Sequence, residues 1–137
     1  MDSNLIQLRK ISDKRGDLTS IESLKDLSFE IKRVYYIYNV PYGQSRGAHA
    51  HKRLEQLMIA MSGSFDIKIV SSLGKKTFTL NEPDWALYIP KMVWREMYNF
   101  SSDAVCLVLA SDHYDENDYI RDYNEFLNLS GALNDSR

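Results

Sequence analysis

Two histidines separated by a single residue are the side chains of this sequence best suited to chemistry. His49 and His51 are followed by Glu55, and all three occupy odd-numbered positions. On an extended strand, residues of one parity point to the same face, so these three groups are expected to converge. An imidazole titrates near neutral pH and is also a common metal ligand. The spacing therefore predicts a metal site or an acid–base site.

A second segment distinguishes these two chemistries. The spacing G-x5-H-x-H-x3-E, from Gly43 to Glu55, resembles the first motif of the cupin barrels. In metal-binding cupins a second motif, P-x-G-x2-H-x3-N, supplies a third imidazole. The corresponding segment here runs from Pro90 to Asn99, and Arg95 stands where that histidine is expected. A guanidinium has no lone pair to donate, and its charge repels a divalent cation. We therefore expect no metal, and the histidines are interpreted as acid–base groups.

The elements that must position these residues are predicted to be strands. Apolar residues alternate with a period near two over most of the chain, in runs separated by turn-forming segments. This rhythm predicts an all-β fold, a sandwich or a barrel. The predicted strands span residues 5–11, 18–22, 34–40, 49–61 (with room for a break inside it), 65–70, 75–80, 85–89, 93–100 and 104–111.

The period changes only near the end of the sequence. From Tyr119 onward the apolar residues Ile120, Tyr123 and Leu127 recur with helical spacing. Residues 115–118 supply carboxylates, which suit a helix N-terminus. We therefore predict one short C-terminal helix that follows this acidic segment.

Composition limits the classes of protein to consider. A length of 137 residues favours one domain, predicted to span residues 1–130 with a flexible tail over 131–137. The net charge of −2 gives no basic field for binding nucleic acid. The single cysteine, Cys106, lies in an apolar run, where it is expected to be buried. The sequence shows neither a signal peptide nor an apolar stretch of about 20 residues. We expect a cytoplasmic protein that binds neither nucleic acid nor membrane.

Longer segments carry a more specific resemblance. They are residues 31–37 (IKRVYYI), 46–56 (RGAHAHKRLEQ), 90–97 (PKMVWREM), 100–103 (FSSD) and 108–121 (VLASDHYDENDYIR). With these segments the chain resembles the cupin-type sugar 3,4-ketoisomerases that act on dTDP-4-keto-6-deoxy-D-glucose. The resemblance implies a homodimeric cupin, or jelly-roll, β-barrel in which the sugar ring lies over the histidines. It also implies that His49 is the catalytic base, with His51 and Tyr35 beside it.

The reaction of that family needs only proton transfers. A ketone at C4 acidifies the hydrogen on C3, so a base can remove this proton and leave an enediolate. Protonation at C4 then moves the ketone to C3. No redox cofactor is required, and the chain contains neither G-x-G-x-x-G nor a Walker loop. His49 would remove the proton, while His51 or Tyr35 would assist the transfer between the oxygens; which group is the final donor stays open.

Four arginines are candidates for contacts with the substrate. A nucleotide diphosphate is negatively charged, and Arg33 and Arg46 are the predicted partners of its phosphates. Arg15 and Arg95 are expected to reach the sugar and to influence which face of the enediolate is protonated. The sequence does not choose between a gluco-like and a galacto-like product.

Three other functions are compatible with the same residues. The first is a 3,5-epimerase of the same 4-keto sugar, which would share the barrel, the histidine base and a tyrosine acid. The second is a cupin that binds a sugar without catalysis, and the third is a metal-dependent cupin oxygenase. The leading prediction is an isomerase that makes a dTDP-3-keto-6-deoxyhexose for the biosynthesis of 3-amino-3,6-dideoxysugars in surface glycans.

Overall fold

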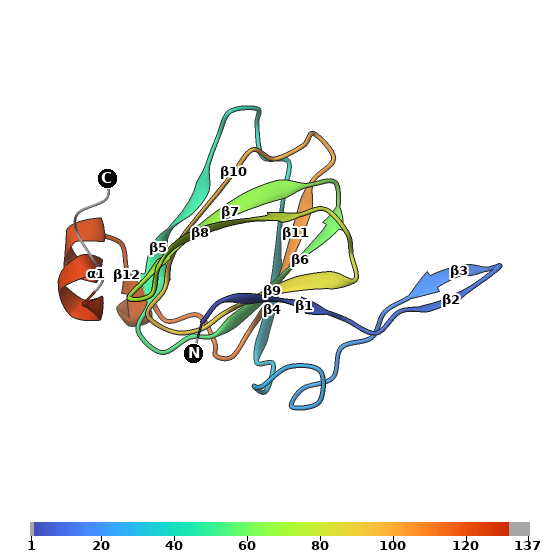
Figure 1. Cartoon of the computed structure of the whole chain (residues 1–137), viewed down its shortest axis with the longest axis horizontal. Coiled ribbons are helices and arrows are strands. Elements are labelled where there is room, and N and C mark those ends of the chain that lie inside the picture. Colours follow the sequence, from blue (N-terminus) through green and yellow to red (C-terminus); the bar gives the residue numbers. More distant parts are fainter. Residues whose placement is uncertain (1, 132–137) are drawn as a thin grey trace.

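Two antiparallel five-stranded sheets face each other and enclose the main core (Figure 1). The structure is a computed structural model that describes residues 2–131. One sheet has the strand order β1-β9-β6-β11-β4, the other β12-β5-β10-β7-β8, and β2 and β3 form a separate hairpin. The strands are β1 (Asn4–Gln7), β2 (Ile11–Asp13), β3 (Gly16–Leu18), β4 (Arg33–Tyr38), β5 (Arg46–His51), β6 (Gln56–Ser62), β7 (Phe65–Ser71), β8 (Gly74–Leu80), β9 (Trp85–Ile89), β10 (Trp94–Tyr98), β11 (Val105–Ala110) and β12 (Tyr119–Ile120). The predicted all-β barrel is confirmed.

Alternation along β4 shows how the sequence sets the faces of the barrel. Tyr35 and Ile37 point inward and pack against the core, whereas Tyr36 and Tyr38 are exposed on the outer face. The odd-numbered residues of β4 are therefore the ones that face the interior. Tyr35 therefore lies on the face that can contribute to a site inside the barrel.

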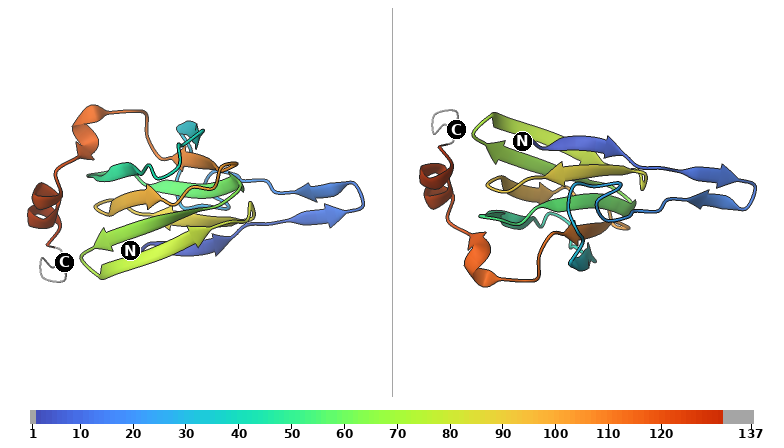
Figure 2. Two further views of the ribbon diagram at one scale, coloured as in Figure 1. Left: turned by 90° about the horizontal axis from the view of Figure 1, so that it is seen from above. Right: turned by 90° about the horizontal axis from the view of Figure 1, so that it is seen from below.

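The first predicted strand is divided in the structure. β1 ends at Gln7, Leu8 is buried, and β2 begins at Ile11, where the chain leaves the barrel. β2 and β3 project from the body as an arm (Figures 1 and 2). The predicted strand over 18–22 is wrong, because β3 ends at Leu18 and the following segment covers the outside of a sheet without pairing.

The segment that follows the arm is apolar although it forms no strand, because it covers the outer face of a sheet. Leu27 and Phe29 are buried in a second cluster against Leu57 and Leu109, on the side of β6 and β11 that faces away from the main core. Both faces of this sheet are thus partly covered by apolar side chains. Apolar content alone does not separate a covering loop from a strand.

The C-terminal helix begins later than predicted. Helix α1 spans Tyr123–Ser130, and the Asp122 carboxylate accepts hydrogen bonds from the backbone N–H groups of Asn124 and Glu125. The acidic segment before it forms a short 3-10 helix, η1 (Glu116–Asp118), which leads into β12. Residues 132–137, most of the predicted tail, lie outside the described residues. No helix within residues 2–131 is long and apolar enough to cross a membrane.

Candidate active site

A cavity of about 360 Å³ opens into the barrel beside β4 and β5. It contains five of the seven predicted site residues: Arg33, Tyr35, Arg46, His49 and Arg95. The remaining lining residues are Ile37, Gly47, Ala48, Met58, Met97, Tyr119 and Arg121. The cavity thus gathers basic, aromatic and imidazole groups from strands that are distant in sequence.

Strand pairing places the proposed base beside an arginine. In the β5–β10 ladder the register sets His49 opposite Arg95. Gly47, two residues before His49, has a φ of +78°, and a Cβ added there would lie 3.2 Å from Met97 Cε. This close approach favours glycine at the entrance of β5 and keeps the cavity open next to His49.

The two imidazoles are in contact, but they differ in access to the cavity. Their ring centroids are 4.8 Å apart and the rings are almost perpendicular, at 87°. His49 lines the cavity, whereas His51 is buried behind it and is 1% exposed. His49 is therefore accessible to a molecule in the cavity, whereas His51 contacts His49 from behind.

Burial and positive charge keep both imidazoles neutral. Desolvation lowers the pKa of His49 to about 3, and the charges of Arg95 and Arg121 act in the same direction. The pKa of His51 falls to about 2, again through burial first and then through Arg95. At neutral pH His49 is an unprotonated imidazole, which is the form that accepts a proton.

Asp118 lies beside His51 and does not line the cavity. Its Oδ2 is 3.3 Å from Nδ1 of His51, although neither ring nitrogen of His51 forms a hydrogen bond with any described residue. The carboxylate accepts the backbone N–H groups of Arg53 at 2.8 Å and Leu54 at 3.2 Å. Asp118 thus fixes the turn that follows β5 and holds a negative charge next to the second imidazole.

Tyr119 is a site residue that sequence reasoning missed. Its ring centroid is 4.9 Å from that of His49 and 4.4 Å from that of His51. The Arg121 guanidinium lies 4.2 Å from the centroid of the Tyr119 ring and is held by Glu116, with Nε 2.9 Å from its carboxylate. The apolar spacing around Tyr119 had suggested a helix, whereas the pairing of β12 with β5 brings it to the histidines.

Arg95 is buried at the floor of the cavity. Its Nη2 donates to the carbonyl oxygen of Val93 at 3.1 Å, and its Nη1 donates to Oε1 of Gln56. The Gln56 amide in turn donates from Nε2 to the Tyr35 hydroxyl at 2.9 Å. Burial lowers the pKa of Arg95 to about 10, so its guanidinium stays charged at neutral pH. Burial raises the pKa of Tyr35, which therefore stays protonated.

Arg33 and Arg46 are the two residues predicted to bind the phosphates. Both line the cavity, and Arg46 is exposed to solvent. The Arg33 guanidinium lies 5.1 Å from the Tyr35 ring centroid, and its buried Nε has no hydrogen-bond partner among the described residues. Each arginine is available to an anionic ligand.

Besides His51, two residues named in the sequence analysis, Arg15 and Glu55, do not line this cavity. Arg15 lies at the tip of the arm, where its side chain is 85% exposed and is paired with Asp13 at 2.7 Å. Its expected contact with the sugar is therefore not made within one chain. Glu55 was expected to join the histidines, but β5 ends at His51 and the next four residues redirect the chain.

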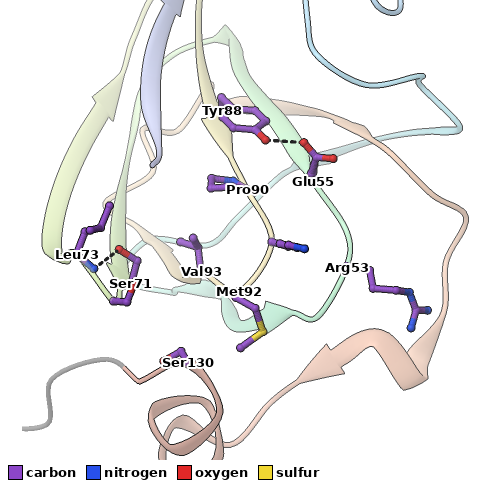
Figure 3. Close-up of a pocket in the computed structure, with 11 residues that line it drawn as sticks. Arg53, Glu55, Ser71, Leu73, Tyr88, Pro90, Met92, Val93 and Ser130 are labelled. Atoms are coloured by element: carbon purple, nitrogen blue, oxygen red, sulfur yellow. Dashed lines mark hydrogen bonds between the residues drawn. The ribbon is translucent and has the colours of Figure 1, made fainter. Parts of the chain in front are cut away.

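Glu55 lies in a different cavity, of about 580 Å³ (Figure 3). Its carboxylate accepts a hydrogen bond from the Tyr88 hydroxyl at 2.5 Å, and the two groups point toward each other in Figure 3. The predicted convergence of three ligand-type groups is thus wrong. Within residues 2–131 no cluster of three or more histidine, cysteine or acidic side chains is arranged to hold a metal ion.

Comparisons with known proteins identify the family of this chain. Residues 1–131 match the family model FdtA, described as "WxcM-like, C-terminal". A TDP-4-oxo-6-deoxy-α-D-glucose 3,4-oxoisomerase from Aneurinibacillus thermoaerophilus is 44% identical over 134 residues, which cover 98% of this chain and 96% of that enzyme. The chain belongs to the FdtA family. The family prediction and the isomerase class are thereby confirmed.

Solved structures of relatives share the fold of this FdtA-family chain. The sugar 3,4-ketoisomerase QdtA from Thermoanaerobacterium thermosaccharolyticum, in complex with TDP, matches with a TM-score of 0.92 and 45% identity over 95% of each chain. A histidine-to-asparagine variant of QdtA is in complex with TDP-4-keto-6-deoxyglucose. The TDP-quinovose 3,4-ketoisomerase WlaRB from Campylobacter jejuni matches with a TM-score of 0.88 and 52% identity, over 92% of this chain and 97% of that one.

The epimerase alternative has only distant structural support. A dTDP-4-dehydrorhamnose 3,5-epimerase from Bacillus anthracis matches with a TM-score of 0.74 and 18% identity, over 86% of this chain and 77% of that one. This likeness shows that the two proteins share the barrel. The predicted cupin-like fold is confirmed by both the close and the distant matches.

Proposed function

We propose that this chain converts TDP-4-keto-6-deoxyglucose into a TDP-3-keto-6-deoxyhexose. The observation that carries the proposal is His49, a neutral imidazole at the wall of a cavity whose floor holds the permanent positive charge of Arg95. Such a pair suits the removal of a proton next to a ketone, because a base and a stabilising charge are both present. The names and ligands of the relatives support this substrate.

The first step forms an enediolate. Nε2 or Nδ1 of His49 takes the proton from C3, the electrons of the C3–H bond form a C3=C4 double bond, and the C4 carbonyl oxygen becomes negatively charged. Arg95 lies at the cavity floor, and the Tyr35 hydroxyl at its wall accepts a hydrogen bond from Gln56 and can donate its own hydrogen to the substrate. Both groups stabilise this negative charge electrostatically. Electrostatic stabilisation of the transition state is the largest contribution to catalysis in many enzymes.

The second step returns one proton and moves another. The proton of the C3 hydroxyl passes to the C4 oxygen, the C3–O bond becomes a carbonyl, and C4 receives a proton. The product is an isomer of the substrate, so no oxidant or reductant is consumed. His49 leaves the first step as an imidazolium and can supply the C4 proton, as can Tyr35; His51 contacts His49 and can support its charge.

Arg33 and Arg46 are proposed to bind the diphosphate, with the sugar directed toward His49. Arginine offers two parallel N–H donors that match the oxygens of a phosphate. The unpartnered Nε of Arg33 supports the assignment, because a ligand oxygen would satisfy it. We place the enzyme in the cytoplasm and its product before a 3-aminotransferase, since a C3 ketone is the group that transamination requires.

We also propose a homodimer. Ile11 and Leu18 on the projecting arm are 65% and 58% exposed, and an apolar groove lies on the outer face of the β4–β11–β6 sheet. β1 is an edge strand with one unpaired side. A second copy of the chain would cover these surfaces.

Light scattering tests the homodimer. The wild type should have twice the monomer mass, whereas Leu18→Asp should shift the mass toward the monomer. A wild-type monomer would contradict the dimer.

Product analysis in deuterated water tests the reaction. Purified enzyme is incubated with TDP-4-keto-6-deoxyglucose, and the product is examined by NMR. We expect a C3 ketone with no deuterium at C5; C4 carries deuterium where the proton on His49 exchanges with solvent, and hydrogen where His49 returns the proton that it took from C3. Deuterium at C5 would favour a 3,5-epimerase, and an unlabelled, unchanged sugar that still binds would favour a non-catalytic binding protein. A parallel incubation in ordinary water keeps H4 in the product, and its couplings give the configuration at C4.

A further inference from the structure

A buried polar chain connects the cavity floor to the Tyr35 hydroxyl. Arg95 donates to Oε1 of Gln56, and Nε2 of Gln56 donates to the Tyr35 oxygen over 2.9 Å. Gln56 is fully buried at the first position of β6. Nothing in the sequence marked it as a site residue. It does not line the cavity itself and is connected to it through Tyr35 and Arg95.

Only one orientation of the Gln56 amide satisfies both neighbours. A guanidinium carries N–H donors and no acceptor, so Arg95 binds the oxygen of the amide and not its nitrogen. The reversed amide would place two donors against each other in a site without solvent, which is unfavourable. The NH2 group is therefore directed at Tyr35.

The hydroxyl of Tyr35 consequently keeps its own hydrogen. Its oxygen accepts the bond from Gln56, and no described residue of the chain accepts the hydrogen of Tyr35. Because Tyr35 lines the cavity, this hydrogen is available to a bound sugar. If the partner behind Tyr35 were an acceptor, the hydroxyl would turn its hydrogen away and present lone pairs to the enediolate.

We infer that Gln56 is a positioning residue: anchored by Arg95, it holds the Tyr35 hydroxyl as a hydrogen-bond donor toward the oxygen that becomes negative in the reaction. The inference rests on the proposed function, because it assigns a direction to a hydrogen bond that matters only if an anion forms in this cavity. The inference also gives Arg95 two distinct effects: its positive charge, and its hydrogen bond that anchors Gln56.

Gln56→Glu is the decisive variant. Glutamate keeps the size of the side chain and gives Arg95 an acceptor, but its second oxygen can only accept from Tyr35. The loss of one donor to a developing oxyanion typically lowers kcat by about 10²–10³-fold. We expect Gln56→Glu to lower kcat by about 100-fold, with KM changed by less than about threefold, and to match Tyr35→Phe.

A second variant, Gln56→Met, distinguishes a positioning role of Gln56 from a purely structural role. Gln56→Met removes both hydrogen bonds without adding an acceptor, so Tyr35 can still donate to the sugar. We expect a loss of only about tenfold in kcat, smaller than that of Gln56→Glu. A purely structural role predicts the opposite order, because methionine leaves the buried Arg95 without its partner while glutamate does not. In a Tyr35→Phe background, neither substitution should cost more than about a further twofold.

The outcomes of this experiment are distinguishable. A wild-type enzyme that leaves TDP-4-keto-6-deoxyglucose unchanged would contradict the proposed function, and this inference with it. If the wild type is active, three results would overturn the inference alone: Gln56→Glu within about threefold of the wild type, a slower Gln56→Met, or a further loss in the Tyr35→Phe background. Circular dichroism and TDP binding verify folding, and Gln56→Met with Tyr35→Phe carries the comparison if the glutamate variant does not fold.

Discussion

If His49 is the catalytic base, as proposed, the activity should tolerate acid far better than an ordinary histidine would allow. An imidazole with the usual pKa of about 6.5 is about 91% neutral at pH 7.5 and about 3% neutral at pH 5, so a reaction that needs it neutral slows about 30-fold between these values. Burial and the nearby arginines lower the pKa of His49 to about 3, so it is about 99% neutral at pH 5. We therefore expect kcat/KM to change by less than about twofold over this range.

The assay is the initial rate of isomerisation at substrate concentrations well below KM. Under these conditions the rate reports kcat/KM, whose pH dependence reflects groups of the free enzyme. The diphosphate diester of a sugar nucleotide has no proton that titrates between pH 5 and 7.5, so the substrate does not mask the result. Circular dichroism at each pH identifies any loss of folded protein.

A matched variant tests the physical cause. Arg121→Gln removes one of the charges that lower the pKa of His49 and leaves Arg95 in place. We expect its acid limb to move upward from that of the wild type. A wild-type profile that falls with an apparent pKa near 6.5 would refute the reasoning, because it would mean that the free enzyme holds His49 in contact with water.

Further predictions concern activity, specificity and stability. His49→Asn should abolish turnover while leaving the melting temperature and TDP binding near those of the wild type, as measured by NMR, thermal melts and calorimetry. Arg95→His should alter the ratio of C4 epimers in the product while leaving some isomerase activity; an unchanged ratio by NMR would remove Arg95 from the control of stereochemistry. Arg33→Met should raise KM more than it lowers kcat in steady-state kinetics, because a phosphate contact persists from substrate to transition state. Gly63→Ala should lower the free energy of unfolding in urea by about 1–3 kcal/mol, because Gly63 has a φ of +64° and an added Cβ would lie 2.3 Å from Ser101 Oγ.

A stability prediction follows from the same histidines. Their folded-state pKa values of about 3 and about 2 lie below the ordinary value of 6.5, so the unfolded chain binds protons that the folded chain does not. The free energy of unfolding should therefore fall as the pH drops below 6.5, by up to about 1.4 kcal/mol per pH unit for each histidine. His49→Asn should reduce this slope in urea titrations at pH 5 and 6.5, and an unchanged slope would contradict the assigned burial.

Local spacing predicted the part of the site that lies on single strands. His49 and His51 share a face because β5 is regular between them, and the odd-numbered face of β4 carries Arg33 and Tyr35. The same rule failed for Glu55, because it assumes that alternation continues through the turn after β5. A parity argument holds only within one unbroken strand.

Residues brought in by pairing between distant segments were not predictable in this way. Tyr119 reaches the histidines because β12 adds to the edge of β5, and Gln56 on β6 reaches Tyr35 on β4 over the intervening strand β11 of the same sheet. Both contacts depend on the three-dimensional order of the strands. The apolar spacing after residue 119 is compatible with both strand β12 and helix α1. Only the Asp122 cap marks where the strand has ended and the helix begins.

The low pKa of His49 raises a question about its strength as a base. A group that binds protons weakly in the free enzyme must still take one from carbon. The charge of Arg95 contributes to the low value, and the enediolate that forms in the same cavity carries the opposite charge. As negative charge grows on the sugar, it offsets Arg95 and raises the proton affinity of His49. The base therefore strengthens as the transition state develops, and the same arginine keeps it unprotonated beforehand.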